Sequence, residues 1–364
     1  MFIVCAPDSF KGTINAADAA AAMARAAIAS GHEAIALPVA DGGEGTGAVL
    51  VAATDGIRHA AETVDPMGRP IEGHWYDLGG GSALVESAVA SGLGVLGAAD
   101  RQPMQLSSVG TGLLIDSAMT AGAETVFVAV GGTGTVDGGC GLLQAIGVDW
   151  LDSTGTVLGP VLPPSKMHTI KAFRQSRAMP NLVALVDTTA PLLGPTGAAQ
   201  MFAPQKGASD TEVEALEGVL TGFAHVIDTN GTVQATPGTG AGGGMGFAIA
   251  AFGGCIRSGA EFVLETLRLD DHLANADLVL TGEGCMDGQT ASGKAPLAVA
   301  RAAAAAGVPC VAIVGMLGDG YESLIDQGVF LTCTSLLEHV PIEEAMGDPA
   351  AAIERVTKTV SDTY

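Results

Sequence analysis

The 364-residue sequence is poor in basic residues, with 16 Lys and Arg against 39 Asp and Glu and a formal net charge of −23. A field of this sign repels nucleic acids and anionic membrane surfaces, so we expect neither as a partner. It also repels anionic small molecules, and a phosphate or carboxylate site therefore needs local Lys, Arg, Mg²⁺ or helix N-termini. Each lysine inside a glycine-rich loop is informative for this reason.

Cysteine pairs and long apolar runs are also missing. The six cysteines are scattered and form no C-x-x-C pair, which argues against a zinc site and against a disulfide framework. No stretch is long and apolar enough to span a bilayer, and the first residues lack the pattern of a signal peptide. We therefore expect a soluble, cytoplasmic protein.

Aromatic residues make up only 4% of the chain, although 48% of it is hydrophobic. The core must then consist mainly of Ala, Val, Leu and Ile, a composition that suits helices packed on parallel strands. The 52 glycines cluster in short runs between apolar segments. Glycine at such places allows a positive φ or the close approach of a ligand.

Strand-like and helix-like segments alternate near both ends of the chain. Residues 2–54 begin this way, with a helix capped by Asn15, and residues 277–332 repeat the pattern, with a helix starting near Pro296. Residues 57–87 instead resemble an antiparallel meander, after which the alternation returns.

These patterns predict an α/β protein of two α/β domains. Residues 1–64 and 271–364 are expected to form a Rossmann-like domain with a parallel sheet. Residues 65–270 are expected to form a second, mixed-sheet α/β domain nested in the first. Two domains in tandem are the alternative.

Two loops near the N-terminus are candidates for substrate binding, because open α/β sheets bind ligands where strands end. The first, residues 6–13, supplies Asp8, Ser9 and Lys11. The second, residues 40–46, supplies Asp41 and Glu44, which are also candidates for binding Mg²⁺ through water. Turn formation, helix capping and favourable interaction with a helix dipole are the alternative roles.

The middle of the chain supplies further candidates, each beside a predicted strand end. Residues 131–139 read GGTGTVDGG, and the amides of Gly132, Thr133 and Gly134 are candidates for cradling phosphate. Tight packing of the strand against the helix is the alternative explanation of these glycines. Residues 238–243 match G-x-G-x-x-G, but no convincing strand precedes them, and we discount a dinucleotide fold.

Asp187 directly follows the strand-like segment 182–186, where a carboxylate can bind a metal or accept a hydroxyl proton. Asp137, in the glycine-rich loop, is the second candidate for this work. Lys206 is a further phosphate candidate. A capping or solvated Asp187 and a surface Lys206 are the alternatives.

Residues 281–294 carry the clearest phosphate signal. Gly288 to Lys294 has the G-x₄-G-K spacing of a phosphate loop, with a helix starting directly behind it. Ala295 replaces the Ser or Thr that holds Mg²⁺ in a standard Walker loop, so Glu283 and Asp287 are candidates for the metal contacts. The phosphate candidates in this stretch are Gly282, Gly284, Gly293 and Lys294.

Taken together, these motifs resemble the bacterial type I glycerate kinase family over nearly the whole chain. The matching runs are APDSFKG at 6–12, ADGGEGT at 40–46, GGTGTVDGG at 131–139, GPTGAA at 194–199, FAPQKGA at 202–208 and LTGEGCMDGQTASGK at 280–294. The resemblance implies transfer of the ATP γ-phosphoryl group to D-glycerate, usually giving 2-phosphoglycerate and ADP, in glycerate and glyoxylate catabolism.

The resemblance marks a site without saying which carboxylate is the base. We expect Lys294, Mg²⁺ and helix amides to dominate, since proteins catalyse phosphoryl transfer mostly by positioning groups and neutralising charge. A kinase that gives 3-phosphoglycerate, another nucleotide-dependent α/β enzyme such as a ligase or a dehydrogenase, and a pure binding protein are the alternatives. The sequence does not decide whether the chain forms a homo-oligomer.

Overall fold

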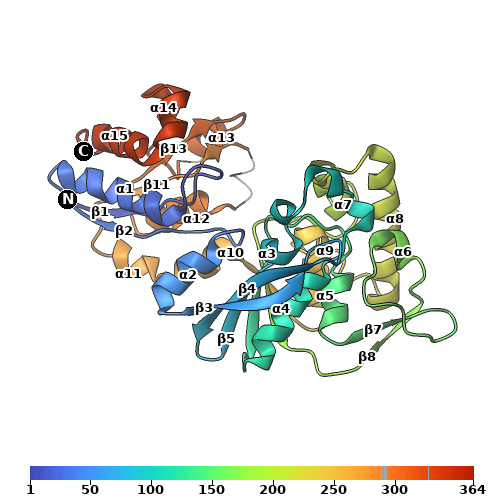
Figure 1. Ribbon diagram of the computed structural model, residues 1–364. Coiled ribbons are helices and arrows are strands. Elements are labelled where there is room, and N and C mark those ends of the chain that lie inside the picture. The colour runs from blue at the N-terminus through green and yellow to red at the C-terminus, as the bar shows by residue number, and fades with distance from the viewer. Residues whose placement is uncertain (289, 291–292, 327) are drawn as a thin grey trace. The chain divides into compact units, whose positions relative to one another are not determined.

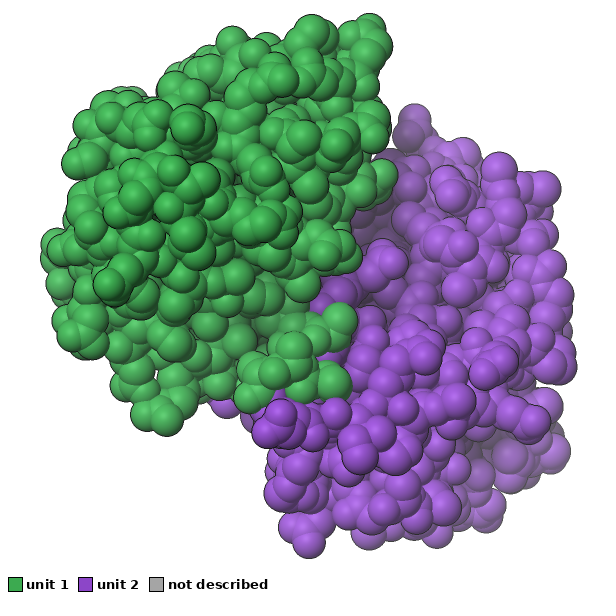
Figure 2. Space-filling model, turned by 60° about the vertical axis from the view of Figure 1, so that its left-hand side comes forward, with its two compact units in different colours: residues 1–41, 48–53, 258–364 green, residues 42–47, 54–257 purple. Residues whose placement is uncertain are grey.

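A computed structural model of the chain describes residues 1–288, 290, 293–326 and 328–364 (Figure 1). The chain divides into two compact units, which Figure 2 shows in different colours. Unit 1 comprises residues 1–41, 48–53 and 258–364, and unit 2 comprises residues 42–47 and 54–257. Unit 1 is therefore built from both ends of the chain.

Within the described residues, unit 1 holds a five-stranded sheet. Its order is β15 (Thr332–Ser335), β13 (Cys310–Val314), β11 (Leu278–Thr281), β1 (Phe2–Cys5) and β2 (Glu33–Ala36). Every neighbouring pair in it is parallel. The two-residue strands β12 (Cys285–Met286) and β14 (Met316–Leu317) pair separately, also in parallel.

Helices cover both faces of this sheet. Alanine-rich α1 (Ala16–Ala29) and α15 (Pro349–Ser361) share a core with Ile3 and Cys5 of β1. Small side chains let these helices approach closely, as the composition predicts. Helix α12 (Ala295–Ala305) packs on β11 and β13, and its residues are absent from that core. Unit 1 also contains all or most of α2 (Thr46–Thr54), α10 (Gly259–Thr266), α11 (Leu269–Leu273), α13 (Glu322–Asp326) and α14 (Ile342–Gly347).

The neighbours β1 and β11 form the switch point of this sheet. The chain leaves β1 through α1 toward β2 at one edge, and it leaves β11 through α12 toward β13 on the other side. Right-handed crossovers in opposite directions place the two helices on opposite faces. The loops that follow β1 and β11 therefore separate and leave a crevice at the carboxyl ends of the strands, where α/β proteins bind ligands.

Unit 2 holds a six-stranded mixed sheet. Its order is β10 (Cys255–Ser258), β9 (Asn181–Val186), β6 (Thr125–Ala129), β5 (Ser82–Glu86), β4 (Pro70–Gly79) and β3 (Ile57–Val64). The β3–β4–β5 pairs are antiparallel and the β5–β6–β9 pairs are parallel. This agrees with a predicted meander followed by alternating helices and strands.

The helices of unit 2 surround a core in which the scarce aromatic residues gather. The ring centroids of Trp150 and Phe223 are 5.1 Å apart, and those of Phe223 and Phe247 are 6.4 Å apart. The helices are α3 (Ala88–Ser91), α4 (Val109–Thr120), α5 (Cys140–Ala145), α6 (Pro164–Met167), α7 (Ala198–Phe202), α8 (Asp210–Ile227) and α9 (Ala241–Ala251). Strands β7 (Val148–Leu151) and β8 (Ala172–Gln175) form an antiparallel pair.

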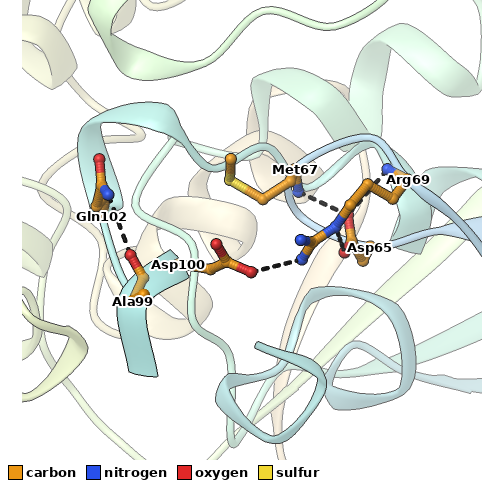
Figure 3. Close-up of polar contacts among 6 residues, drawn as sticks. All are labelled: Asp65, Met67, Arg69, Ala99, Asp100 and Gln102. Carbon is orange, nitrogen blue, oxygen red and sulfur yellow. Dashed lines mark hydrogen bonds and ion pairs between the residues drawn. The ribbon is translucent and has the colours of Figure 1, made fainter. Parts of the chain in front are cut away.

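The turn between β3 and β4 is held by a buried carboxylate (Figure 3). Asp65 Oδ1 accepts hydrogen bonds from the amides of Met67 and Arg69, both at 2.9 Å, and Asp65 Oδ2 accepts one from Arg69 Nε at 2.5 Å. The same guanidinium pairs with Asp100 at 2.8 Å. This network ties the hairpin turn to the 3₁₀ turn η2 (Ala98–Asp100).

The domain boundaries differ from those predicted. The expected boundary after residue 64 placed β3 with the N-terminal strands, but β3 pairs with β4 along its whole length and belongs to the sheet of unit 2. Residues 258–270 lie in unit 1, and residues 42–47 lie in unit 2. For β3, hydrogen bonding to its strand neighbour β4, rather than sequence proximity, decides the assignment.

Some predicted features fall partly outside the described residues. Gln289, Ala291 and Ser292 of the predicted phosphate loop do so, as does Gln327 in the alternating segment 277–332. Among the helices that the structure does describe, none has the length and apolar character needed to cross a membrane.

Candidate active site

A pocket of about 350 Å³ opens in unit 1 where β1 and β11 end. The loop after β1 closes on itself, because Phe10 N–H donates to Ile14 at 2.9 Å and Thr13 Oγ1 donates to Phe10 at 2.6 Å. Thr281 Oγ1, at the end of β11, donates to the carbonyl of Ala6 at 2.8 Å and ties the two strand ends together. The predicted residues that line the pocket are Asp8, Ser9, Lys11, Asp41, Glu283, Gly284, Asp287 and Lys294.

Asp8 is buried in the wall of this pocket, and its Oδ1 accepts a 2.6 Å hydrogen bond from the amide of Ser9. Burial, and after it the negative charges of Asp41 and Glu283, raise the pKa of Asp8 to about 7 against the opposing effects of Ser9 and Lys11. A carboxyl whose pKa is raised by neighbouring carboxylates favours a cation or a proton beside it. The acidic side of the pocket is therefore suited to a metal ion or to a proton-transfer step.

Glu283 lies between a hydroxyl and an ammonium group. Its Oε1 accepts a 2.6 Å hydrogen bond from Thr290 Oγ1, and its Oε2 is 3.7 Å from Lys294 Nζ. Burial raises the pKa of Glu283, while Lys294 and Thr290 oppose the shift. Lys294 precedes α12 as its N-cap, so its ammonium group and the first amides of that helix lie at the same end.

The glycines after β11 have several roles, and some differ from the prediction. A Cβ on Gly282 would lie 1.9 Å from the carbonyl of Ile313, so this glycine allows close strand packing. A Cβ on Gly284 would lie 3.2 to 3.4 Å from backbone atoms of Lys11 and Phe10, and Gly284 lines the pocket. Gly293, with φ +117°, lines a separate pocket of unit 1. Of these three, only Gly284 lies beside the candidate site.

A second, smaller pocket of about 150 Å³ lies in unit 2. Asp187 follows β9 directly, as predicted, and lines this pocket. Gly132, Thr133 and Lys206 line it too, so the structure brings together four of the residues expected to bind phosphate or to act in catalysis. They lie in a different unit from Lys294, and the predicted site residues therefore form two groups.

Lys206 is a buried lysine at the wall of the small pocket. Its Nζ donates a 2.9 Å hydrogen bond to the carbonyl of Thr135. Burial lowers the pKa of Lys206 to about 7, and the charge of Asp137 partly opposes the shift. An incoming anion would stabilise the charged form of this lysine.

Besides Gly282 and Gly293, three further predicted site residues lie away from these two pockets. Asp137 is fully buried, and its carboxylate accepts hydrogen bonds from the amides of Ser108, Gly139 and Gly141 and from the Ser108 hydroxyl, at 2.7 to 3.2 Å. With these partners it organises the loop, and a catalytic role is not supported. Gly134 donates its amide to the carbonyl of Ser91 at 2.7 Å, so this amide is not directed at a phosphate.

Glu44 is the third. It is exposed, it belongs to unit 2 and its charge contributes to the raised pKa of Glu86, after the larger effect of burial. Asp41 lies in unit 1. The expected Asp41–Glu44 pair is therefore divided between the units.

Sequence reasoning missed the apolar wall of the larger pocket. It consists of Met316, Leu336, Leu337, Ile342, Ala345, Met346 and Pro349. Apolar residues spaced three and four apart in α14 gave a signal, but that signal is the same for a helix face that covers a core. The pattern therefore gave no reason to place a ligand there.

An α/β unit with lysines and carboxylates around its switch point is typical of enzymes that bind phosphorylated ligands. The family model described as the glycerate kinase family matches residues 3–364. The chain is 36% identical to glycerate 2-kinase of Escherichia coli K12, covering 100% of this chain and 98% of that protein. It is 35% identical to glycerate kinase of Bacillus subtilis 168, with 99% and 97% covered.

The solved structures include a similar fold. A crystal structure from Salmonella typhimurium LT2, assigned as glycerate kinase 2, superposes with a TM-score of 0.84 at 34% identity, covering 100% of this chain and 98% of that one. The chain belongs to the glycerate kinase family.

Membership of a kinase family makes the fit of a metal ion relevant. In the described part of the chain, no group of three or more His, Cys, Asp or Glu side chains is arranged to hold a metal by itself. Mg²⁺ in phosphoryl-transfer enzymes is usually held by one or two carboxylates together with phosphate oxygens and water. Glu283 and Asp287, which line one pocket with Lys294, offer that smaller set of donors.

Proposed function

We propose that this protein transfers the γ-phosphoryl group of ATP to D-glycerate and gives 2-phosphoglycerate and ADP. The observation that carries the proposal is the pocket of unit 1, which gathers two lysines and four carboxylates at the switch point of a parallel sheet in a member of the glycerate kinase family. We place the protein in the cytoplasm, in the catabolism of organic acids.

Lys294 neutralises phosphate oxygens beside the N-terminus of α12. Its side chain is 21% exposed and is held near Glu283 at 3.7 Å, so it can shift toward an anion without leaving the pocket wall. The helix amides add positive partial charge in the same direction. These are the contacts that phosphoryl transfer requires most, because negative charge accumulates on the transferring group.

The loop after β1 binds glycerate. Lys11 is exposed on the pocket and pairs with the substrate carboxylate, while Asp8, Ser9 and Asp41 receive the hydroxyl groups. Glycerate is a small anion with two hydroxyls, and a mixture of one cation and several hydrogen-bonding groups matches it.

In unit 2, Asp187 either accepts the proton of the attacking hydroxyl or binds the metal ion. Lys206, with Gly132 and Thr133, binds a phosphate group. Glu283 and Asp287 are the other candidates for holding Mg²⁺, which would supply positive charge to the phosphate oxygens when bound. The side chains and backbone amides named above bind and orient ATP and glycerate.

The first prediction concerns Lys294→Ala. The parent protein should release ADP only when D-glycerate is added, and the variant should lose about 10²-fold or more in kcat/KM for ATP, since removal of one charged contact to a transferring group has an effect of that size. A coupled assay of ADP release measures the glycerate dependence of the parent and the kcat/KM of the variant.

Lys166→Met is the matched control, because Lys166 is an exposed lysine in α6 that lines neither pocket described above. ATP consumption that is independent of glycerate would contradict the proposed function. A folded Lys294→Ala protein with the parent kcat/KM at low and at saturating ATP would contradict the role of Lys294 alone.

A further inference from the structure

The pocket of unit 1 has two halves of different chemistry. One half carries the charged residues already described. The other is a continuous apolar surface that runs from the 3₁₀ turn η6 (Leu336–Glu338) through α14 to Pro349, with Met316 beside it. In this half, every lining side chain from Met316 and from residues 336–349 is a hydrocarbon or a thioether.

Four side chains of this apolar surface are exposed. Met346 is 59% exposed, Ile342 56%, Met316 47% and Leu337 40%. Single exposed apolar side chains are common, but several that share one pocket wall mark a binding surface.

The exposed side chains stand on a well-anchored scaffold. Ser335 and Glu338 form a capping box, and Ser335 Oγ donates to the carbonyl of Gly315 at 2.9 Å. Arg355 of α15 pairs with Glu344 of α14 at 2.6 Å, and α15 itself begins with a capped turn in which the amide of Ala351 donates to Asp348. The apolar wall is therefore formed before any ligand arrives, which lowers the entropic cost of binding.

The occupant must combine a flat apolar part with an anionic part. Glycerate has no apolar part and cannot use this wall. A nucleoside triphosphate has both, and a volume of about 350 Å³ lies within the range of small-molecule sites. Methionine thioethers adapt well to the faces of ring systems.

We infer that the adenine ring of ATP packs against Leu337, Ile342 and Met346, with its triphosphate extending toward Lys294. This inference rests on the proposed function, which supplies ATP as the nucleotide. It assigns base recognition to α14 and to the turn before it, neither of which belongs to a glycine-rich motif.

The test compares ATP with inorganic tripolyphosphate, which keeps the anionic part and lacks the base. Calorimetry with the full chain and Mg²⁺ measures both affinities for the parent and for the Ile342→Ala and Met346→Ala variants. Each variant should bind ATP about three- to tenfold more weakly, because apolar contact area is lost, while the affinity for tripolyphosphate stays unchanged.

Ile28→Ala is the matched control. Ile28 is 55% exposed on α1, nearly the same as Ile342, and does not line the pocket. The Ile28→Ala variant should bind ATP and tripolyphosphate with the same affinities as the parent. Circular dichroism of all the variants shows whether each is folded.

Unchanged ATP affinity in both pocket variants would overturn the inference. Equal losses for ATP and tripolyphosphate would also overturn it, because the substitutions would then act on the charged half. A change of oligomeric state in the Ile342→Ala protein without a loss of ATP affinity would assign the wall to a subunit interface instead. Base-dependent binding without glycerate phosphorylation would leave the adenine site standing and reject the proposed function.

Discussion

The protonation of Asp8 depends strongly on its surroundings. Its pKa is raised to about 7, chiefly by burial and then by Asp41. An exposed aspartate would be ionised at every pH above about 5. Near neutral pH, Asp8 can therefore hold a proton in the absence of a metal ion and release it when a cation enters the pocket.

The raised pKa leads to a prediction about stability. A carboxyl whose folded-state pKa lies above its unfolded value contributes stability below pH 4 that is lost as the pH rises through about 7. Asp8→Asn cannot ionise, so without metal and nucleotide it should exceed the parent in free energy of unfolding at pH 8 by about 1–3 kcal/mol, with the difference shrinking toward pH 4. Urea denaturation at both pH values measures this.

The expected difference in free energy of unfolding is smaller than three full pKa units would give, because the pKa shift of Asp8 comes partly from the charges of Asp41 and Glu283 and not from burial alone. Asp362→Asn, at an exposed aspartate that ends α15, is the control and should show no such dependence. An Asp8→Asn protein no more stable than the parent at pH 8 would show that Asp8 carries no ionisation penalty.

The pKa of Lys206 is lowered, whereas that of Asp8 is raised, so its effect on stability has the opposite pH dependence. Its folded-state pKa of about 7 lies below the ordinary value, so the stability that the neutral lysine gives is present above pH 10.5 and is lost as the pH falls through 7. Lys206→Met should therefore have a higher free energy of unfolding than the parent at pH 7, by about 1–3 kcal/mol. Loss of the hydrogen bond to Thr135 reduces this gain. The gain should also be smaller at pH 9.5 than at pH 7.

Urea denaturation at pH 7 and pH 9.5 measures these free energies of unfolding, and Lys166→Met, at an exposed lysine, serves as the control. Equal destabilisation of Lys206→Met at both pH values would make Lys206 a structural hydrogen-bond donor only. A more stable but less active variant would show that the buried cation is kept for anion binding at a cost in stability.

At this scale the sequence identified candidate positions but not their environments. Asp8, Asp137 and Asp187 all occur beside glycines or strand ends, yet Asp8 lines a pocket, Asp137 is fully buried and hydrogen-bonded, and Asp187 lines a second pocket. The differences arise from partners distant in sequence, such as Ser108 for Asp137. No local pattern contains that information.

At the scale of elements, the glycine-rich first turn of α9, in which Gly242 to Gly244 have non-helical backbone angles, packs against the loop at 131–139. Gly242, Gly243 and Gly244 all have positive φ, and Gly138 N–H donates to the carbonyl of Gly243 at 2.9 Å. A Cβ on Gly243 would lie 2.0 Å from the carbonyl oxygen of Thr135, the group that accepts the Lys206 hydrogen bond. The G-x-G-x-x-G match at 238–243 thus reflects packing of two loops.

This contact predicts that Gly243→Ala destabilises the protein by about 2–4 kcal/mol, through backbone strain and collision with Thr135. Gly218→Ala is the matched control. Gly218 is exposed within α8, nothing lies near its missing Cβ, and alanine should stabilise that helix by about 0.5–1 kcal/mol. Chemical denaturation of both variants measures the two effects, and a Gly243→Ala protein as stable as the parent would contradict the packing role.

Most elements were predictable because their signals are local. Asn15 caps α1 as expected, with its Oδ1 accepting from Asp18 N–H, and the segments of the meander became β3, β4 and β5. The apolar wall on α14 was not predictable, since an amphipathic pattern does not reveal what its apolar face covers. The detailed use of each glycine was not predictable either, because it depends on neighbours in space.

At the scale of the whole molecule, a strongly acidic chain presents lysines at its candidate sites. The net charge of −23 repels anionic substrates at long range, while Lys11 and Lys294 in unit 1 and Lys206 in unit 2 provide local attraction. The alternating pattern at both termini was enough to predict a unit built from the two ends of the chain. It was not enough to place residues 42–47 and β3, whose assignment depends on contacts with the sheet of unit 2.

The most direct test of the proposed function is the ³¹P spectrum of the product formed from ATP, Mg²⁺ and D-glycerate. Phosphate on the C2 oxygen couples to a single carbon-bound proton, so the account predicts a new phosphoester doublet that grows in step with ADP. A triplet, from coupling to the two protons at C3, would identify 3-phosphoglycerate and contradict the proposed regiochemistry. Release of ADP and inorganic phosphate with no new phosphoester signal would contradict the kinase activity itself.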